Sequence, residues 1–132
     1  MKYNYPRIII YSLISLPMAA LYFPIFIYLA NFYALDYSFS LGLIGIIFLL
    51  IRLVDAFTDP IMGYLSDQVK SFFGGRKIWF LISLPLIIFG CWKLFVPPEN
   101  EQIATSYFVI YLTVLTIGWT IMWTPYYALG AE

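Results

Sequence analysis

Three charged residues interrupt one of the most apolar parts of the chain, in the stretch RLVDAFTDPIMGYLSD between Arg52 and Asp67. Arg52, Asp55 and Asp59 are spaced i, i+3 and i+7. On a helix, at about 100° per residue, they point within about 60° of one another. A charge near the centre of a bilayer costs between about 2.5 and more than 10 kcal/mol. Three charges on one face therefore indicate a stripe that faces a polar cavity or polar partners.

The stripe carries one positive and two negative side chains. Arg52 can neutralise Asp55, and a network that only locks neighbouring helices together is one interpretation. That network leaves Asp59 as an excess negative charge, which a cation would balance. The two carboxylates, the hydroxyl of Thr58 and the backbone carbonyl freed by Pro60 are hard oxygen ligands of the kind that Na⁺ requires. Protonation of one aspartate is the alternative, so the pair predicts a site for Na⁺ or H⁺.

Long apolar segments must position this stripe. The 132 residues are 63% hydrophobic, 21% aromatic and only 11% charged, whereas about a quarter of a typical soluble domain is charged. Four runs have about the 20 residues that cross a hydrocarbon core of about 30 Å. They lie at approximately 8–33, 41–65, 78–96 and 104–127. The runs are too long and too continuous for barrel strands, so the sequence predicts an all-α membrane protein with four transmembrane helices.

The connections between the runs indicate an orientation. The basic residues Lys2, Arg7, Lys70, Arg76 and Lys77 lie at the amino terminus or between the second and third runs, and the other two connections contain no Lys or Arg. The positive-inside rule then predicts a cytoplasmic amino terminus in a multi-pass protein of the plasma membrane. The first run also resembles a signal peptide, but its length favours a spanning helix.

The composition excludes several classes of function. Seven basic and seven acidic residues cancel, so no basic surface for nucleic acid is expected. The chain has no histidine and a single cysteine, Cys91, which removes the usual zinc sites, hydrolytic triads and an internal disulfide. We expect no enzyme activity and no cofactor.

The fourth run offers a polar partner for the stripe. The second and fourth runs share a direction, and counted from their outer ends Thr120 falls between the depths of Asp55 and Asp59. Its hydroxyl reaches the carboxylate level if the two helices are neighbours. A hydrogen bond from this hydroxyl to its own i−4 carbonyl is the alternative.

Several motifs together resemble a known family. RLVDAFTDPIMGYLSD, followed by GGRK and later by GWTIMWTPYYALGAE, is similar to the glycoside-pentoside-hexuronide:cation symporters, the melibiose-permease-like branch of the major facilitator superfamily. The resemblance implies twelve helices in two six-helix halves, alternating access, and solute uptake driven by Na⁺ or H⁺. The chain ends at PYYALGAE, directly after the fourth run. We therefore expect the first four helices of a longer transporter, with the remaining helices missing here.

The resemblance also implies roles for individual residues. The two aspartates of the family's second helix bind the coupling cation, which assigns that role to Asp55 and Asp59. A threonine of the fourth helix assists at the position of Thr120. Thr58 stands where melibiose permease has an asparagine.

The sugar-binding residues of the family are matched less well. Ala19 and Trp123 stand where the galactoside-binding aspartates are expected, and Tyr127 stands at the position of the stacking tryptophan. Trp123 and Tyr127 then form an aromatic platform for a sugar ring or another amphipathic solute, and Arg52 joins them as a substrate-binding residue. Packing in the core is the alternative for both aromatic residues.

The segment GYLSDQVKSFFGGRK resembles the superfamily's loop between helices two and three. It implies a cytoplasmic gate built from Gly63, Asp67, Arg76 and Lys77, in which Asp67 exchanges ion pairs with the two basic residues. Simple anchoring by positive charge at the inner surface is the alternative.

A cation-coupled symporter of a sugar or glycoside is therefore the leading interpretation. Transport of a lysolipid or other amphipathic solute is an alternative within the same branch. A stand-alone four-helix protein that assembles as an oligomer with a structural or accessory role is an alternative of another class, in which the charged stripe joins helices.

Overall fold

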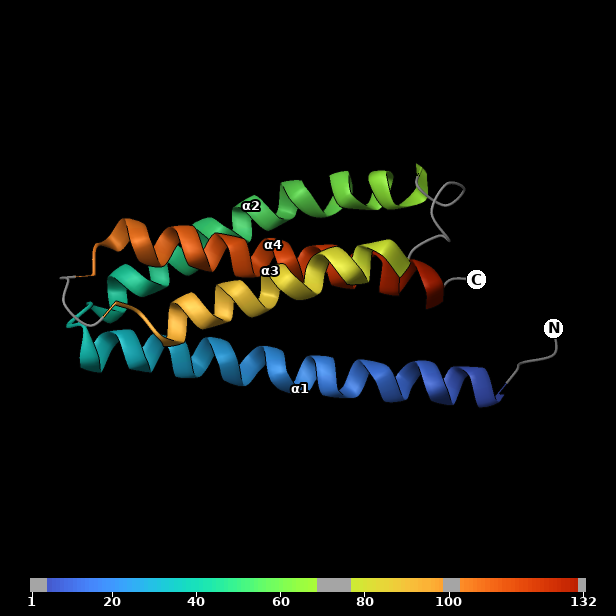
Figure 1. Ribbon diagram of the computed structural model, residues 1–132, viewed down its shortest axis with the longest axis horizontal. Coiled ribbons are helices and arrows are strands. Elements are labelled where there is room, and N and C mark those ends of the chain that lie inside the picture. Colours follow the sequence, from blue (N-terminus) through green and yellow to red (C-terminus); the bar gives the residue numbers. More distant parts are fainter. Residues whose placement is uncertain (1–4, 69–76, 99–102, 131–132) are drawn as a thin grey trace. The chain divides into compact units, whose positions relative to one another are not determined.

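The computed structural model describes residues 5–68, 77–98 and 103–130, which form four helices in chain order (Figure 1). They are α1 (Tyr5–Asp36), α2 (Leu41–Gln68), α3 (Lys77–Phe95) and α4 (Thr105–Gly130). No strand occurs within these ranges. The prediction of an all-α fold with four helices is confirmed, and each predicted run lies within three residues of its helix at both ends.

The chain divides into two compact units, Met1–Phe39 and Ser40–Glu132, which are described separately. The first unit holds α1, whose 32 residues extend for about 48 Å at 1.5 Å per residue, more than a hydrocarbon core requires. The helix is followed by Ser38, whose φ of 57° is left-handed. The backbone N–H of Phe39 then donates to the carbonyl of Tyr33 (3.1 Å), which satisfies a carbonyl at the helix end.

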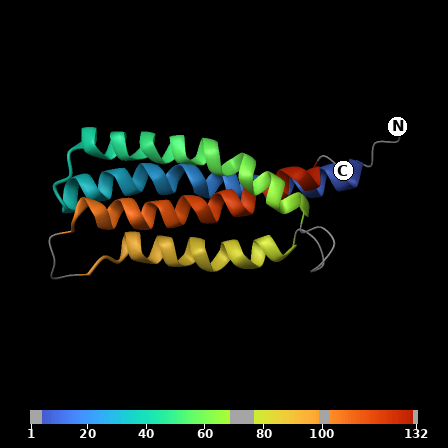
Figure 2. The ribbon, with the colours of Figure 1, turned by 90° about the horizontal axis from the view of Figure 1, so that it is seen from above.

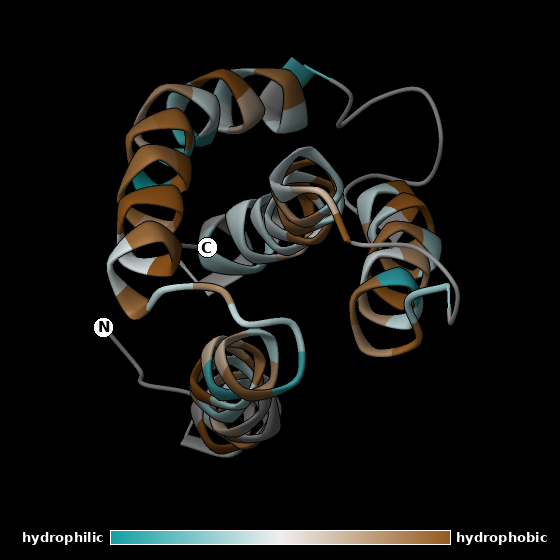
Figure 3. Ribbon diagram, turned by 90° about the vertical axis from the view of Figure 1, so that its left-hand side faces the viewer, coloured by the Kyte–Doolittle hydropathy of each residue, from teal (hydrophilic) through white to brown (hydrophobic). Residues whose placement is uncertain are grey.

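Apolar length distinguishes the helices of the second unit. Three described segments are long and apolar enough to cross a membrane, Leu41–Ser66, Ile78–Phe95 and Thr105–Thr124. Figure 3 shows brown apolar positions along these helices, interspersed with pale positions of intermediate hydropathy and with few strongly hydrophilic ones. The second unit therefore has the lipid-facing surface of a membrane protein.

Helix α4 lies at the centre of the second unit, because it packs against both α2 and α3 (Figures 1 and 2). Half of its apolar span is buried, against 17% of the spans in α2 and α3. Helices α2 and α4 run in the same direction, and α3 runs in the opposite one (Figure 1). The polar residues of α2 and α4 can therefore share a single interface.

Two glycines bring α3 and α4 close together. A Cβ atom at Gly118 would lie 2.8 Å from Cγ1 of Ile87 and 3.1 Å from its backbone nitrogen, and one at Gly90 would lie 3.0 Å from Cα of Leu115. Such distances leave no room for a side chain, so only glycine permits this approach of the backbones. The α3–α4 pair is consequently packed backbone against backbone.

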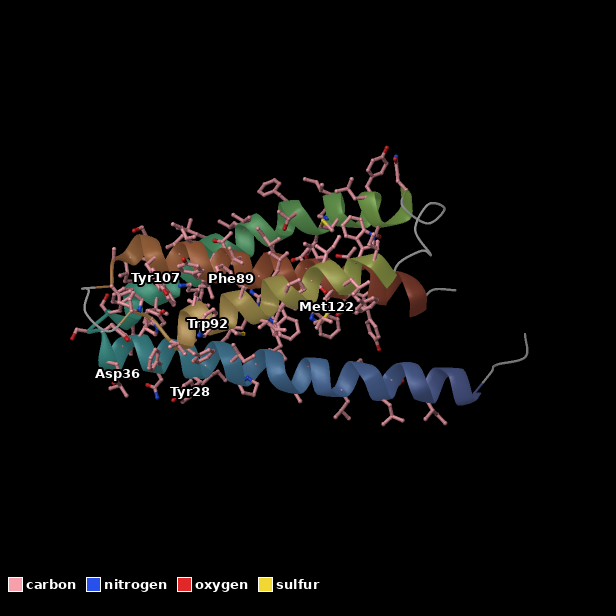
Figure 4. All side chains as sticks on the ribbon, viewed as in Figure 1. Tyr28, Asp36, Phe89, Trp92, Tyr107 and Met122 are labelled. Carbon is pink, nitrogen blue, oxygen red and sulfur yellow. The ribbon has the colours of Figure 1, made fainter. Side chains whose placement is uncertain are left out.

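A polar contact joins the same two helices near the C-terminal end of α3. The hydroxyl of Tyr107 donates to the carbonyl of Lys93 (2.7 Å), which satisfies one of the carbonyls left open at a helix end. The rings of Phe89 and Tyr111 lie 5.9 Å apart in an edge-to-face arrangement; Figure 4 labels Phe89 on α3 and Tyr107 on α4. Aromatic packing thus extends the contact beyond the glycines.

Candidate functional site

Two contacts fix the register between α2 and α4. The ring centroids of Phe48 and Phe108 lie 6.3 Å apart, and a Cβ atom at Gly63 would lie 3.8 Å from Cγ2 of Thr124. The residue numbers differ by 60 in the first pair and by 61 in the second. Because this difference changes by only one residue over about four turns, the two helices advance together between these contacts, and a difference of 61 gives the levels to within about one residue.

This register assigns a level on α4 to each residue of the stripe. Asp55 lies level with Thr116, and Asp59 lies level with Thr120. One turn earlier, the buried Ile51 lies level with the buried Leu112. The α2–α4 interface therefore changes from apolar in its first half to polar in its second half.

Asp55 is the residue of the stripe that enters this interface. It is only 9% exposed and continues the buried row of Ile44, Ile47 and Ile51 along α2, which has the spacing of a helix face. One of its carboxylate oxygens, Oδ2, lies 3.6 Å from Nη1 of Arg52. A carboxylate is thus held inside an interface that is otherwise apolar up to this point.

The other two charged residues lie at the edge of the interface. The side chain of Arg52 is 56% exposed, and Asp59 is exposed. An ion pair with an exposed partner contributes little to the free energy of unfolding. The stripe therefore crosses from the exposed edge of α2 into the α2–α4 contact, and Asp55 is its innermost member.

Thr120 differs from Thr58, Thr116 and Thr124. The hydroxyls of Thr58, Thr116 and Thr124 donate to backbone carbonyls three or four residues earlier, at 3.3, 3.0 and 2.8 Å. Thr120 is buried, at 8% exposure, yet its hydroxyl makes no hydrogen bond with any described residue. The i−4 carbonyl bond considered as an alternative is not formed, and the hydroxyl stays available at the level of Asp59.

The chemistry of this arrangement suits a monovalent cation. No group of three or more His, Cys, Asp and Glu side chains forms in the part of the chain that the structure describes, whereas a divalent ion commonly takes several carboxylates. Two carboxylates, one guanidinium and the neutral hydroxyl of Thr120 give these groups a single excess negative charge. A cation bound here would take its remaining ligands from hydroxyl and carbonyl oxygens.

Thr116 is a polar residue of this interface that the sequence analysis did not consider. It is buried, at 4% exposure, and lies level with Asp55. A signal was present, because Thr116, Thr120 and Thr124 recur every four residues and so form one row along α4. The sequence alone does not show that this row lies against α2, because that depends on how the two helices pack.

The predicted substrate residues fall into two separate places. The rings of Trp123 and Tyr127 stack at 5.2 Å with an interplanar angle of 24°, and Tyr127 is 63% exposed. The register puts Trp123 level with Met62, which is ten residues, or about 15 Å, along α2 from Arg52. The two rings stack on each other at a distance from Arg52, and the binding of a solute by these three residues stays a prediction. Ala19 lies on α1, in the other unit.

The predicted gate is described only in part. Gly63 lies in α2 opposite Thr124, Asp67 lies in the last turn of α2, and Lys77 begins α3. The side chains of Asp67 and Lys77, and the whole of Arg76, lie outside the described residues. The exchange of ion pairs in this gate stays a prediction.

Comparison with known proteins connects these features to a family. The model of the family described as "MFS/sugar transport protein" matches residues 10–132. Relatives include the inner membrane symporter YicJ (33% identical over 80% of this chain) and the putative glycoside/cation symporter YagG (31% over 76%), both of Escherichia coli. The isoprimeverose transporter of Lactiplantibacillus pentosus is 29% identical over 74% of this chain. No solved structure matches the chain significantly.

The matches cover most of this chain but only a small part of each relative. The matched regions make up 23%, 22% and 20% of the three relatives, so the chain spans about a fifth of their length. The family model, in contrast, covers nearly all of this chain. The chain therefore belongs to the MFS/sugar transport protein family, the melibiose-permease-like branch of the major facilitator superfamily, whose members are multi-pass membrane transporters rather than enzymes.

Proposed function

We propose that this chain is the amino-terminal part of a symporter that couples uptake of a sugar or glycoside to the entry of Na⁺ or H⁺ by alternating access. The observation that carries the proposal is the burial of Asp55 on α2, the helix that packs against α4. On α4, the buried Thr120 has a hydroxyl that makes no hydrogen bond with any described residue. The printed names of three relatives, two symporters and one isoprimeverose transporter, support the same class of function.

The charge of the stripe gives the coupling a physical basis. With Arg52 paired to Asp55, Asp59 leaves one excess negative charge, which a low-dielectric surrounding disfavours. A carrier whose halves close around this charge is stabilised when one cation neutralises it. By linkage, a solute that favours the same closed state raises the affinity for the cation, and the cation raises the affinity for the solute.

The stacked pair of Trp123 and Tyr127 is the part of this chain that we assign to the solute. The flat face of a sugar ring packs on an aromatic ring of this kind, and so does an amphipathic solute such as a lysolipid. The aromatic pair fits both classes of solute, and the uptake experiment described below distinguishes between them. The gate at the cytoplasmic end, with Asp67, Arg76 and Lys77, is part of the same proposal.

The experiment that tests this proposal uses the gene expressed with all of its downstream coding sequence. Right-side-out membrane vesicles are given an inward Na⁺ gradient, an inward H⁺ gradient or neither, and uptake of a panel of glycosides and of a lysolipid is measured. We expect accumulation of one glycoside under one of the two gradients, and its loss when an ionophore dissipates that gradient.

Variants of two aspartates make the test specific to the stripe. Asp59→Asn removes the excess charge and should abolish gradient-driven accumulation. Asp36→Asn makes the same chemical change at the last residue of α1, outside the stripe, and should leave accumulation unchanged. Gradient-driven accumulation at the wild-type level in Asp59→Asn would contradict the proposal.

A further inference from the structure

Thr116 is a buried polar residue of α4 at the level of a buried carboxylate. It is 4% exposed and lies level with Asp55, which is 9% exposed. The register that pairs them rests on contacts on either side of them, Phe48 with Phe108 and Gly63 with Thr124. A hydroxyl and a carboxylate are therefore buried at the same level of one interface.

The hydrogen of the Thr116 hydroxyl is already used. Thr116 Oγ1 donates to the carbonyl of Thr113 at 3.0 Å, and a hydroxyl has one hydrogen to donate and two lone pairs to accept with. Towards any other group, the Thr116 hydroxyl can therefore act only as an acceptor. An ionised carboxylate is also an acceptor only, so these two groups cannot hydrogen-bond to each other, whereas a cation between them would be bound by both.

Helix α4 does not provide a positive charge next to Asp55. This helix contains no charged residue, and the charged groups near Asp55 are Arg52 and Asp59 on α2 itself. Arg52 approaches Asp55 to 3.6 Å but stays 56% exposed at the edge of the interface. A cation that enters the interface would find both a carboxylate oxygen and the lone pairs of a hydroxyl.

Thr116 and Thr120 differ in what they can do. The hydroxyl of Thr120 has no hydrogen bond within the described ranges, so it can donate to a carboxylate in the empty site or accept in the loaded one. Thr116 stabilises only the loaded site, because its hydrogen is held by its own helix. A group that interacts with only one of two states shifts the equilibrium between them.

We propose that Thr116 is a further cation-binding residue, whose hydroxyl oxygen stabilises Asp55 selectively in its cation-loaded state. The assignment rests on the proposed function, since it requires that a monovalent cation occupies the α2–α4 interface. It adds a ligand to the site and makes Thr116 a determinant of cation affinity.

The test measures the cation concentration that gives half-maximal uptake by the complete transporter. Thr116→Val keeps the size of the side chain and removes the oxygen, and it should raise the half-saturating concentration of Na⁺, or of H⁺ if protons drive uptake, by about five- to tenfold. Thr116→Ser keeps the oxygen and should restore the wild-type value within about twofold. Maximal uptake should change less than half-saturation in both variants.

Thr124→Val is the matched control. Thr124 lies in the same row and also donates to a backbone carbonyl (2.8 Å), but it lies level with Gly63 rather than with a carboxylate. Half-saturation should stay at the wild-type value. If Thr116→Val is recovered in low yield, Thr116→Ala provides a second variant without the oxygen, and gel filtration confirms that each variant is folded.

The outcomes separate the two proposals. Gradient-driven uptake by the wild type, together with equal half-saturation in Thr116→Val and Thr124→Val, would overturn the role of Thr116 and leave the symporter intact. A fall in maximal uptake alone would also overturn it, because a structural defect lowers the number of active molecules without changing their affinity. If uptake by the wild type is the same with and without the Na⁺ and H⁺ gradients, the proposed symport is contradicted, and the proposed role of Thr116 is contradicted with it.

Discussion

The two faces of α4 show opposite solutions to packing in a membrane. Towards α3, glycines at 90 and 118 bring the backbones so close that an added Cβ atom would meet atoms at 2.8 to 3.0 Å. Towards α2, the same helix presents Thr116 and Thr120 at the levels of two carboxylates, and an added Cβ at Gly63 would have ordinary contact at 3.8 Å. On one face the two glycines bring the backbones close together, and the other face accommodates polar groups.

This difference teaches where movement and ion binding are to be expected. A contact made of backbone against backbone has few alternative arrangements, so α3 and α4 should move as one body. A contact that contains a buried carboxylate changes its energy when a cation arrives or leaves. If a cation binds there as proposed, we expect the stability of the α2–α4 contact, and not that of the α3–α4 contact, to depend on whether the cation is bound.

The largest effect on stability should come from filling the α3–α4 contact. Gly118→Val should destabilise the complete protein by about 1–3 kcal/mol, because overpacking forces a close contact apart. The added Cβ meets not only the side chain of Ile87 but also its backbone nitrogen, at 3.1 Å, which cannot rotate away. Unfolding of the detergent-solubilised protein by heat or by SDS measures the change.

Gly45→Ala is the control for that substitution. Nothing lies within 4 Å of a Cβ atom at Gly45 in α2, so this variant should gain about 0.5–1 kcal/mol from the higher helix propensity of alanine. Equal effects of Gly118→Val and Gly45→Ala would show that the close approach of α3 and α4 does not contribute to stability.

An intermediate effect, on affinity, should come from the polar face. Thr120→Val removes a hydroxyl that makes no hydrogen bond with the described residues and lies at the level of Asp59. It should raise the cation concentration that gives half-maximal uptake by about tenfold, which corresponds to about 1.4 kcal/mol. Thr120→Ser should keep most of the affinity. Unchanged half-saturation in Thr120→Val would remove Thr120 from the site while leaving the aspartates in it.

The smallest effect on stability should come from the edge of the stripe. Arg52→Gln breaks the pair with Asp55, but the Arg52 side chain is 56% exposed, and exposed pairs contribute about 0–1 kcal/mol. The unfolding temperature should therefore change far less than in Gly118→Val. A loss as large as that of Gly118→Val would place Arg52 among the groups that hold the helices together.

The helices were predictable because apolar length is a local property. The run at 41–65 predicted α2 to within three residues of its ends, and the chemistry that starts the helix is also local. The hydroxyl oxygen of Ser40 accepts the backbone N–H of Leu43 (3.1 Å), as a helix cap does. The spacing of Arg52, Asp55 and Asp59 likewise predicted one stripe, since a helix fixes which residues share a face.

The depth of Thr120 was harder to predict, because it depends on two helices. Counting from the outer ends placed it between Asp55 and Asp59, whereas the packing places it level with Asp59. The register makes the first residue of α4, Thr105, level with Ile44, which lies three residues after the start of α2. Helix α4 thus starts three residues, or about 4.5 Å, further along than α2 does. No pattern within either helix reveals this offset.

The role of Thr116 could not be predicted for a related reason. Its spacing from Thr120 and Thr124 was visible, but the same helix carries apolar and glycine residues on the face that meets α3. Only the contacts of Phe108 and Thr124 with α2 show which row meets the carboxylates. Spacing selects the members of a face, and packing selects its partner.

The most direct test of the central claim, that a coupling cation binds at the α2–α4 interface, is the accumulation ratio of solute in vesicles containing Asp55→Asn. The amide keeps the shape of the side chain but cannot carry the charge that a cation neutralises. We predict that this variant still exchanges solute across the membrane without a gradient but no longer accumulates it against one. Accumulation at the wild-type ratio, under the same imposed gradient, would contradict the claim.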